Sequence, residues 1–206
     1  MLDSKGFDLW ANGYDVSVGL SDEDDTYPFA GYKNVLASVY AGVMEKGPCR
    51  VLDIGFGTGV LTAKLYEAGC GIYGQDFSPN MVKLAKDKMP DAHLVTADFA
   101  EGIAEELKAL RYDAVVATYS LHHIEEEAKP GFLRALTELL AEGGTLFIGD
   151  VAFETRAELE LCRETAGDEW DDEESYFVIE ELLPLFPSLG FEKLSHCAGV
   201  LTLRRD

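Results

Sequence analysis

Residues 51–59 read Val-Leu-Asp-Ile-Gly-Phe-Gly-Thr-Gly, and this stretch decides the fold. Its apolar start predicts a buried parallel strand. The three alternate glycines predict a tight turn, because glycine adopts positive φ and lets a ligand approach the main chain closely. Residues 60–68 have apolar side chains at helical spacing and precede Gly69, which predicts a helix with a glycine C-cap. A strand, a turn and a helix N-terminus with N–H groups facing a ligand are therefore expected.

The spacing of the glycines discriminates between ligands. A dinucleotide-binding turn follows G-x-G-x-x-G, but the third glycine would fall at Val60. A phosphate-binding P-loop needs a Gly-Lys pair, which this turn lacks. The pattern is instead D-x-G-x-G-x-G, with Asp53 two residues before the first glycine. A carboxylate there favours a ligand with a positive amino group and repels a pyrophosphate. The alternative is a strand–turn–helix unit that binds nothing.

Composition narrows the range of partners. The chain has 206 residues, which fits one domain with a sizeable core. Its 38 acidic and 17 basic residues give a formal net charge of −21, which disfavours nucleic acid and anionic membranes as partners. We see no membrane span, no secretory signal and no C-x-x-C pair among the four cysteines. We therefore expect a cytoplasmic protein. The composition predicts no oligomeric state.

A second acid follows the next predicted strand, residues 70–75. Asp76 lies at the carboxyl end of that strand, where open α/β sheets bind ligands. Such an acid can accept hydrogen bonds from both hydroxyls of a ribose. Ser78 and Pro79 predict the start of a helix, with Ser78 as its N-cap. After a third strand at 92–96, Asp98 is suited to cap a helix near residues 101–110.

The fourth predicted strand, 112–118, runs into Tyr119-Ser120-Leu121-His122-His123-Ile124. This loop leaves the sheet beside the glycine turn, so we expect it to carry the substrate chemistry. A histidine there can act as a general base, or it can simply bond to the backbone. We expect no metal, because adjacent histidines point different ways and no other ligand set has zinc spacing.

The remaining pattern completes an α/β fold. We predict a Rossmann-like, seven-stranded, mostly parallel sheet with helices on both faces and a C-terminal antiparallel hairpin. Asp150 ends the fifth strand, 145–151, and either faces the cleft or caps the next helix. The acidic run 168–174 is either a solvated loop or a lid that prefers a cationic substrate. Further helices are predicted at 27–46, 81–88, 130–140, 154–165 and 179–186, and the hairpin at 191–197 and 200–204.

Three of these motifs resemble, in order and spacing, the cofactor motifs of class I S-adenosylmethionine-dependent methyltransferases. The motifs are the glycine turn, the stretch from Gly74 to Met81 and the pair Asp98-Phe99. The Ser-Leu-His-His run and residues 10–15 are similar to small bacterial methyltransferases of the YrrT-like group. The resemblance implies a single methyltransferase domain over 1–206. Residues 1–47 would form a helical leader and possible lid, and residues 48–206 the Rossmann-like core.

The resemblance also implies a cofactor, S-adenosyl-L-methionine, and a role for each motif. Asp53 and the glycine turn would hold the methionine part, Asp76 the ribose, and Asp98 with Phe99 the adenine. Tyr14 and Trp10 are candidate lid residues, or they simply pack on the sheet. The implied cofactor-binding residues are Asp53, Gly55, Phe56, Gly57, Thr58, Gly59, Asp76, Phe77, Met81, Asp98, Phe99 and Tyr14. Tyr119, His122 and His123 would lie toward the methyl acceptor as catalytic residues.

Three functions are compatible with these residues. The first is methyl transfer from S-adenosylmethionine to a small-molecule acceptor. The second is a protein that binds S-adenosylmethionine without turnover and acts through a protein partner. The third is another enzyme on this fold, such as an aminopropyl transferase or a nicotinamide-dependent oxidoreductase, although Val60 disfavours the nicotinamide version.

Overall fold

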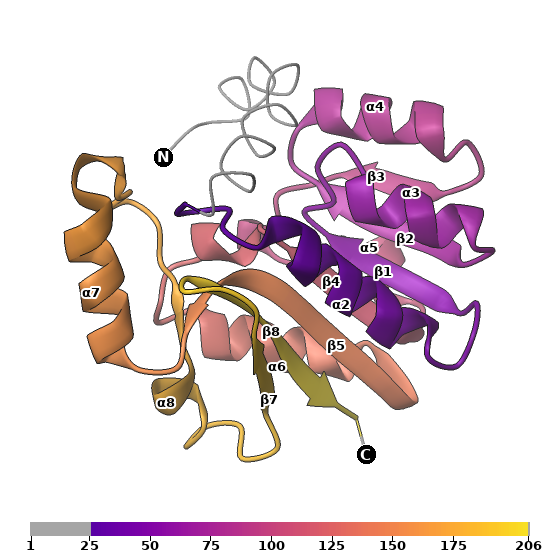
Figure 1. The fold of residues 1–206 in the computed structure, drawn as a ribbon. Helices are drawn as coiled ribbons and strands as arrows, with labels where there is room; N and C mark the ends of the chain where they lie inside the picture. The colour runs from indigo at the N-terminus through magenta and orange to yellow at the C-terminus, as the bar shows by residue number, and fades with distance from the viewer. Residues whose placement is uncertain (1–25, 206) are drawn as a thin grey trace.

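The computed structural model describes residues 26–205, and its centre is a twisted sheet (Figure 1). Along the sheet the strands run in the order β3-β2-β1-β4-β5-β8-β7. Pairing is parallel from β3 to β5 and antiparallel where β8 meets β5 and β7. The strands are β1 (Arg50–Ile54), β2 (Gly71–Asp76), β3 (His93–Thr96), β4 (Tyr112–Thr118), β5 (Leu140–Phe153), β7 (Gly190–Lys193) and β8 (Ala198–Arg204). The predicted mostly parallel sheet with a closing antiparallel pair is confirmed.

Helices cover both faces of the sheet, because each strand buries alternate side chains on opposite sides. In β4, for example, Val116 packs into the core on one face and Val115 into the core on the other. One core contains side chains of α2 (Tyr32–Met44), α3 (Val60–Glu67), α4 (Pro79–Lys88) and α7 (Arg156–Ala166). The other contains side chains of α5 (Glu105–Lys108), α6 (Lys129–Glu138) and α8 (Ile179–Leu182).

Several predicted helices are shorter in the structure. The helix predicted at 27–46 begins only at Tyr32, because Gly31 takes a left-handed conformation with φ of 74°. The helix predicted at 101–110 is divided by Gly102, with the 3-10 turn η1 (Phe99–Glu101) before it and α5 after it. The helix predicted at 179–186 ends at Leu182, since Pro184 offers no N–H to continue it. Turns and irregular backbone occupy the residues that were predicted as helix but lie outside the observed helices.

Two features of the C-terminal half were not predicted. The two-residue strand β6 (Phe177–Val178) pairs in parallel with the end of β5. The last strand, β8, inserts between β5 and β7 rather than lying at the edge. The acidic run therefore leaves α7 and returns to the sheet beside the end of β5, where Asp150 is located.

The order of the strands reverses direction at the β1–β4 pair, because the chain moves outward from β1 to β3 and then returns to β4. Ligands of open α/β sheets bind at such a switch point, outside the carboxyl ends of the strands. The glycine turn follows β1 and the histidine loop follows β4, so both lie at this crevice. Within residues 26–205 no helix has the length and apolar character needed to cross a membrane.

Candidate active site

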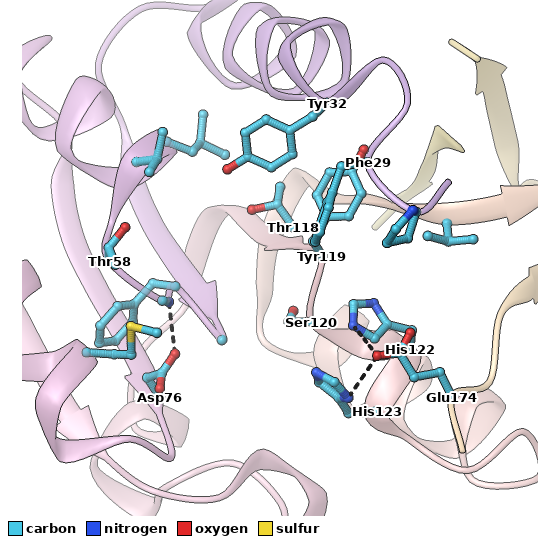
Figure 2. A pocket seen from close by; sticks show the side chains of 18 of the residues that line it. Phe29, Tyr32, Thr58, Asp76, Thr118, Tyr119, Ser120, His122, His123 and Glu174 are labelled. Carbon is cyan, nitrogen blue, oxygen red and sulfur yellow. Dashed lines mark hydrogen bonds and ion pairs between the residues drawn. The ribbon is translucent and has the colours of Figure 1, made fainter. Parts of the chain in front are cut away.

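A cavity of about 520 Å³ lies at the carboxyl ends of the central strands. In Figure 2, Thr58 and Asp76 lie on one side of it, His122, His123 and Glu174 on the other, and Phe29, Tyr32 and Tyr119 between them. Of the predicted site residues, the lining includes Gly55, Phe56, Gly57, Thr58, Asp76, Phe77, Met81, Phe99, Tyr119, His122 and His123. Asp53, Gly59 and Asp98 are not part of the lining, and Tyr14 and Trp10 lie outside the described residues.

The three glycines of the turn all have positive φ: 70° at Gly55, 55° at Gly57 and 77° at Gly59. A Cβ on Gly55 would come within 2.5 Å of the Ser120 Cβ, so the turn packs tightly against the loop after β4. A Cβ on Gly57 would meet no atom of residues 26–205 within 4 Å. Because Gly57 lines the cavity, that open space is where a ligand can lie directly on the main chain.

Asp76 ends β2 and holds the glycine turn in place. One carboxylate oxygen accepts a hydrogen bond from the Gly57 N–H at 2.9 Å, and the other accepts one from the Ser78 N–H at 2.9 Å. The side chain is buried and lines the cavity. Each carboxylate oxygen can accept more than one hydrogen bond, so Asp76 retains capacity for the hydroxyls of a ligand. Ser78 caps α4 as predicted, accepting from the Met81 N–H at 3.2 Å.

Asp53 lies one side chain behind the cavity wall. Its Oδ2 accepts a hydrogen bond from the Thr62 hydroxyl, and Thr62 lines the cavity. Its Oδ1 is buried and has no hydrogen-bond partner among residues 26–205. The pKa of Asp53 is raised to about 7: burial raises it most, the Thr62 hydrogen bond lowers it, and the charge on Asp76 raises it. A positive group in the adjacent cavity would favour the ionised form.

Asp98 and Phe99 follow β3. Phe99 is buried and lines the cavity, as its predicted role requires. The Asp98 side chain is exposed, and its Oδ1 accepts a hydrogen bond from the Ala100 N–H at 2.8 Å. Asp98 therefore has the capping role that the sequence left open, although it caps η1 rather than a longer helix. Its role at an adenine stays a prediction.

Tyr119 begins the loop after β4 in an unusual conformation. It has a positive φ of 49°, which is uncommon for a non-glycine residue. Its N–H donates to the Gly149 carbonyl at 2.8 Å, which ties the loop to β5. Its ring centroid lies 5.4 Å from that of Phe29 and 5.0 Å from that of Tyr32. The aromatic residues just before and at the start of α2 thus meet the histidine loop across the cavity (Figure 2).

His122 is buried and held by a carboxylate. Its Nδ1 lies 2.7 Å from Oδ1 of Asp150, and the Oδ2 of Asp150 accepts from the Leu121 N–H at 3.1 Å. Burial lowers the pKa of His122, but the charge and hydrogen bond of Asp150 more than offset it, and the net pKa is raised. Asp150 thus faces the cleft region rather than capping α7. Its hydrogen bond leaves Nε2 as the nitrogen of His122 that faces Glu174.

The expectation that the adjacent histidines point different ways is wrong. The two rings lie 4.2 Å apart at 63°, and both direct a nitrogen at Glu174. His122 Nε2 is 3.6 Å and His123 Nδ1 is 3.9 Å from the same oxygen, Oε1 of Glu174 (Figure 2). The short turn η2 (Leu121–His123) brings the rings to one side of the loop. Burial and the charge of His122 lower the pKa of His123 to about 3.

The acidic run forms part of the cavity wall. Glu169, Asp171, Glu173 and Glu174 line the cavity although most of this segment is also exposed. Among residues 26–205, the side chains that line the cavity include these acids but no lysine and no arginine. Because these side chains line the cavity, their positions agree better with a segment that covers the cleft than with a loop that contacts only solvent.

Aromatic residues anchor this acidic segment. Tyr27 stacks on Trp170 with ring centroids 5.0 Å apart. The hydroxyls of Tyr27 and Tyr176 form a hydrogen bond, and the Tyr176 hydroxyl also donates to Oε2 of Glu174 at 2.9 Å. The Ser175 N–H donates to the His122 carbonyl at 2.9 Å. Together these contacts fix Glu174 over the histidine loop.

Comparison with known proteins identifies the class that this fold and site define. A family model described as a methyltransferase domain matches residues 51–144. An uncharacterized methyltransferase of Alkaliphilus oremlandii is 32% identical over 192 residues, which cover 90% of this chain and 87% of the relative. The chain belongs to this methyltransferase family. A second uncharacterized methyltransferase, from Geobacillus sp. strain WCH70, is 34% identical over 193 residues, 90% of this chain and 87% of its own length.

Solved structures of methyltransferases share the fold. The DhpI–SAH complex aligns with a TM-score of 0.72 at 18% identity, covering 98% of this chain and 94% of that one. Magnesium protoporphyrin IX methyltransferase from Synechocystis PCC 6803 with bound SAH aligns with a TM-score of 0.67 at 20% identity, covering 86% of this chain and 85% of that one. The predicted Rossmann-like fold of this class is confirmed.

Sequence reasoning missed several residues of the site. Asp150 was assigned two possible roles, and only the structure shows that it holds His122. Glu174 was one acid in a run of six, and Tyr27 and Phe29 were assigned to a helix that begins later. Trp170, inside the acidic run, could have revealed Glu174, because a tryptophan there indicates a segment that packs against the protein and is not fully in solvent.

Proposed function

We propose that this protein transfers a methyl group from S-adenosyl-L-methionine to a small-molecule acceptor. The observation that carries the proposal is the junction of Asp76 with the glycine turn: a buried carboxylate bonded to the Gly57 N–H beside open space over the turn. Relatives named as methyltransferases, and similar folds solved with SAM or SAH, support the same cofactor.

The described residues fit that cofactor in three places. Asp76 offers charged acceptors to the ribose hydroxyls, as the sequence predicted. Phe99, Phe77 and Met81 line the same part of the cavity with apolar surface suited to adenine. Beneath the wall, Asp53 has a buried oxygen without a hydrogen-bond partner among residues 26–205, and its negative charge favours the amino group of the methionine part. Thr62, which lines the cavity, lies between that carboxylate and the ligand.

The acceptor would occupy the end of the cavity lined by Tyr119, His122 and His123. This end is bounded by Phe29, Tyr32 and the acidic segment, and its described charged side chains are acids. Such a wall favours acceptors that are neutral or carry positive charge. The net charge of −21 points in the same direction and disfavours nucleic acid as the acceptor.

When bound, S-adenosylmethionine supplies a methyl group on a sulfonium, which the acceptor displaces in line. The protein's part is to position the two reactants and exclude water. Tyr119, held in its strained conformation by the Gly149 carbonyl, fixes the aromatic wall between the two ends of the cavity. His122 Nε2 is the atom oriented to receive a proton from the acceptor, because Asp150 engages Nδ1.

The test compares cofactors first and acceptors second. Isothermal titration of the full chain with S-adenosylmethionine, S-adenosylhomocysteine and NAD should give binding of the first two alone. Methyl transfer is then measured with radiolabelled cofactor across amines, hydroxyls and thiols. Binding of NAD alone would overturn the proposal. Binding of S-adenosylmethionine without transfer to any acceptor would favour the protein without turnover that acts through a partner.

A further inference from the structure

We propose that His122, His123 and Glu174 form a site for a divalent transition-metal ion of the zinc type at the acceptor end of the cavity. This inference goes beyond methyl transfer, because the site is defined by its own side chains and does not require the cofactor. The three residues line the cavity together (Figure 2).

The ligand atoms are already gathered. His122 Nε2 and His123 Nδ1 lie 3.6 and 3.9 Å from Oε1 of Glu174, and the three ligand atoms all lie within 4.8 Å of one another. Two atoms bound to one zinc ion at about 2.1 Å and a tetrahedral angle are about 3.4 Å apart. The two separations between the histidine nitrogens and Glu174 Oε1 exceed that spacing by only about 0.2 and 0.5 Å.

Outer hydrogen bonds orient two of the three ligands. Asp150 Oδ1 engages His122 Nδ1 at 2.7 Å, and Asp150 is itself fixed by the Leu121 and Val151 N–H groups. The Tyr176 hydroxyl donates to Oε2 of Glu174, which leaves Oε1 directed at the histidines. Histidines and carboxylates that bind metals are commonly held in this way, with the far atom bonded to a carboxylate or another polar group.

The charge around the site favours a cation. Asp150 is fully buried behind His122, and Glu169, Asp171 and Glu173 line the same cavity. One positive charge among residues 26–205 lies nearby: Lys129, whose Nζ is bonded to the carbonyl and hydroxyl oxygens of Ser175 and lies 4.5 Å from the Phe177 ring centroid. Its charge acts to lower the pKa of both histidines, so it opposes part of the attraction that the surrounding acids exert on a cation.

Two imidazoles and one carboxylate leave coordination positions open. Such three-residue sets hold zinc and other first-row ions that keep a position for water or substrate. The residues line the cavity, so that position would face the methyl acceptor. An acceptor oxygen, nitrogen or sulfur bound there would lose its proton more readily, because the ion stabilises the deprotonated form. His122 Nε2 would then be a ligand and not a proton acceptor.

A second group, Cys162, His196 and Cys197, could also take a metal, and the experiment must separate the two. Cobalt(II) does so, because thiolate ligands give an intense charge-transfer absorption, whereas histidine and carboxylate ligands give only weaker d–d bands. The full chain is treated with EDTA, dialysed and titrated with CoCl₂ and then ZnCl₂. Variants are Glu174→Gln, His123→Asn and Cys162→Ser, and Glu173→Gln is the matched acid that lines the cavity outside the proposed ligand set.

We expect one equivalent of cobalt with d–d bands, displaced by zinc and retained in Cys162→Ser and Glu173→Gln. Glu174→Gln and His123→Asn should each weaken the affinity at least tenfold while thermal melting shows a folded protein. Absence of cobalt binding, bands that disappear only in Cys162→Ser, or wild-type cobalt affinity in Glu174→Gln and His123→Asn would overturn the proposal. S-adenosylmethionine affinity is measured on the same metal-free protein, so a failed metal site leaves the proposed methyl transfer separately testable.

Discussion

Replacing Asp76 by alanine should damage cofactor binding more than any other single change on the glycine-turn side of the cavity. The carboxylate serves two purposes at once: it accepts from the Gly57 and Ser78 N–H groups, each at 2.9 Å, and it would accept from the ribose hydroxyls. A hydrogen bond to a charged group contributes about 1.5–3 kcal/mol. Loss of the ribose contact alone therefore corresponds to roughly a 10- to 150-fold increase in Kd.

The same substitution also leaves two backbone donors without their acceptor. Of the two donors only the Ser78 N–H is fully buried, and an unsatisfied buried donor costs about 1–3 kcal/mol, so the free energy of unfolding should fall by about that amount. Ser78→Ala is the control, because it removes the helix cap to the Met81 N–H at 3.2 Å and keeps the Asp76 carboxylate. That variant should lose about 1 kcal/mol of stability and keep its affinity.

The assay is isothermal titration with S-adenosylhomocysteine, paired with urea unfolding of each variant. A Kd for Asp76→Ala within threefold of wild type, in protein shown to be folded, would refute the ribose assignment. Equal losses of affinity in Asp76→Ala and Ser78→Ala would show instead that both act by loosening the turn.

Three further predictions address the rest of the cofactor site. Asp98→Ala should raise the Kd for S-adenosylhomocysteine about fivefold, because one carboxylate oxygen accepts from the Ala100 N–H and the other can accept from the adenine amino group. An unchanged Kd in a titration would show that Asp98 only caps η1. Gly57→Ala should lower the free energy of unfolding, measured in urea, by about 1–2 kcal/mol, because Gly57 has a φ of 55°. It should also raise the Kd for S-adenosylhomocysteine at least tenfold, because the added methyl group fills the space over the turn. Binding as tight as in the wild type would contradict a cofactor lying on the main chain at Gly57. Between pH 6 and 8 the affinity for S-adenosylmethionine should rise by up to about tenfold, because the pKa of Asp53 is about 7 in the free protein and the ligand's amino group favours the ionised carboxylate. Asp53→Asn should lack this rise in the same titrations. An equal rise in that variant would contradict the role of Asp53 at the amino group.

The raised pKa of Asp53 also has a consequence for stability. Its folded pKa, about 7, lies above the ordinary value of 3.8, so the fold favours the protonated form. The contribution is fully present below about pH 4 and is lost as the pH rises through 7. Urea unfolding of the cofactor-free protein should therefore show a component of stability that falls between pH 4 and 7. The Asp53→Asn variant should have a flatter profile over that range, and an identical slope would contradict a raised pKa of the buried Asp53 carboxylate.

Local patterns were enough to predict the parallel half of the sheet and the glycine turn. Residues 112–118 were predicted as a strand and β4 has those bounds, because a continuous apolar run between turn residues leaves few alternatives. The Asp76 and Ser78 positions followed from the same logic, since a strand end and a helix cap are set by neighbours in the chain. The type and bounds of these elements follow from local sequence, although the hydrogen bond from Gly57 to Asp76 that holds the turn spans 19 positions.

The acceptor end could not be predicted in this way, because its contacts join distant segments. Glu174 reaches His122 across 52 positions of sequence, and Tyr27 reaches Tyr176 across 149. The helix predicted at 27–46 failed at its start because Gly31 takes a positive φ, which apolar periodicity does not reveal. Likewise, the directions of two adjacent histidine side chains depend on the η2 turn and on Asp150, not on their order in the sequence.

A crystal structure grown with S-adenosylhomocysteine tests the central claim most directly. The ribose hydroxyls should lie within hydrogen-bond distance of Asp76, the main chain of Gly55–Gly59 should run beneath the methionine part, and the sulfur should face Tyr119 and the histidine pair. Density for the ligand outside this cavity, or a ribose turned away from Asp76, would contradict the account.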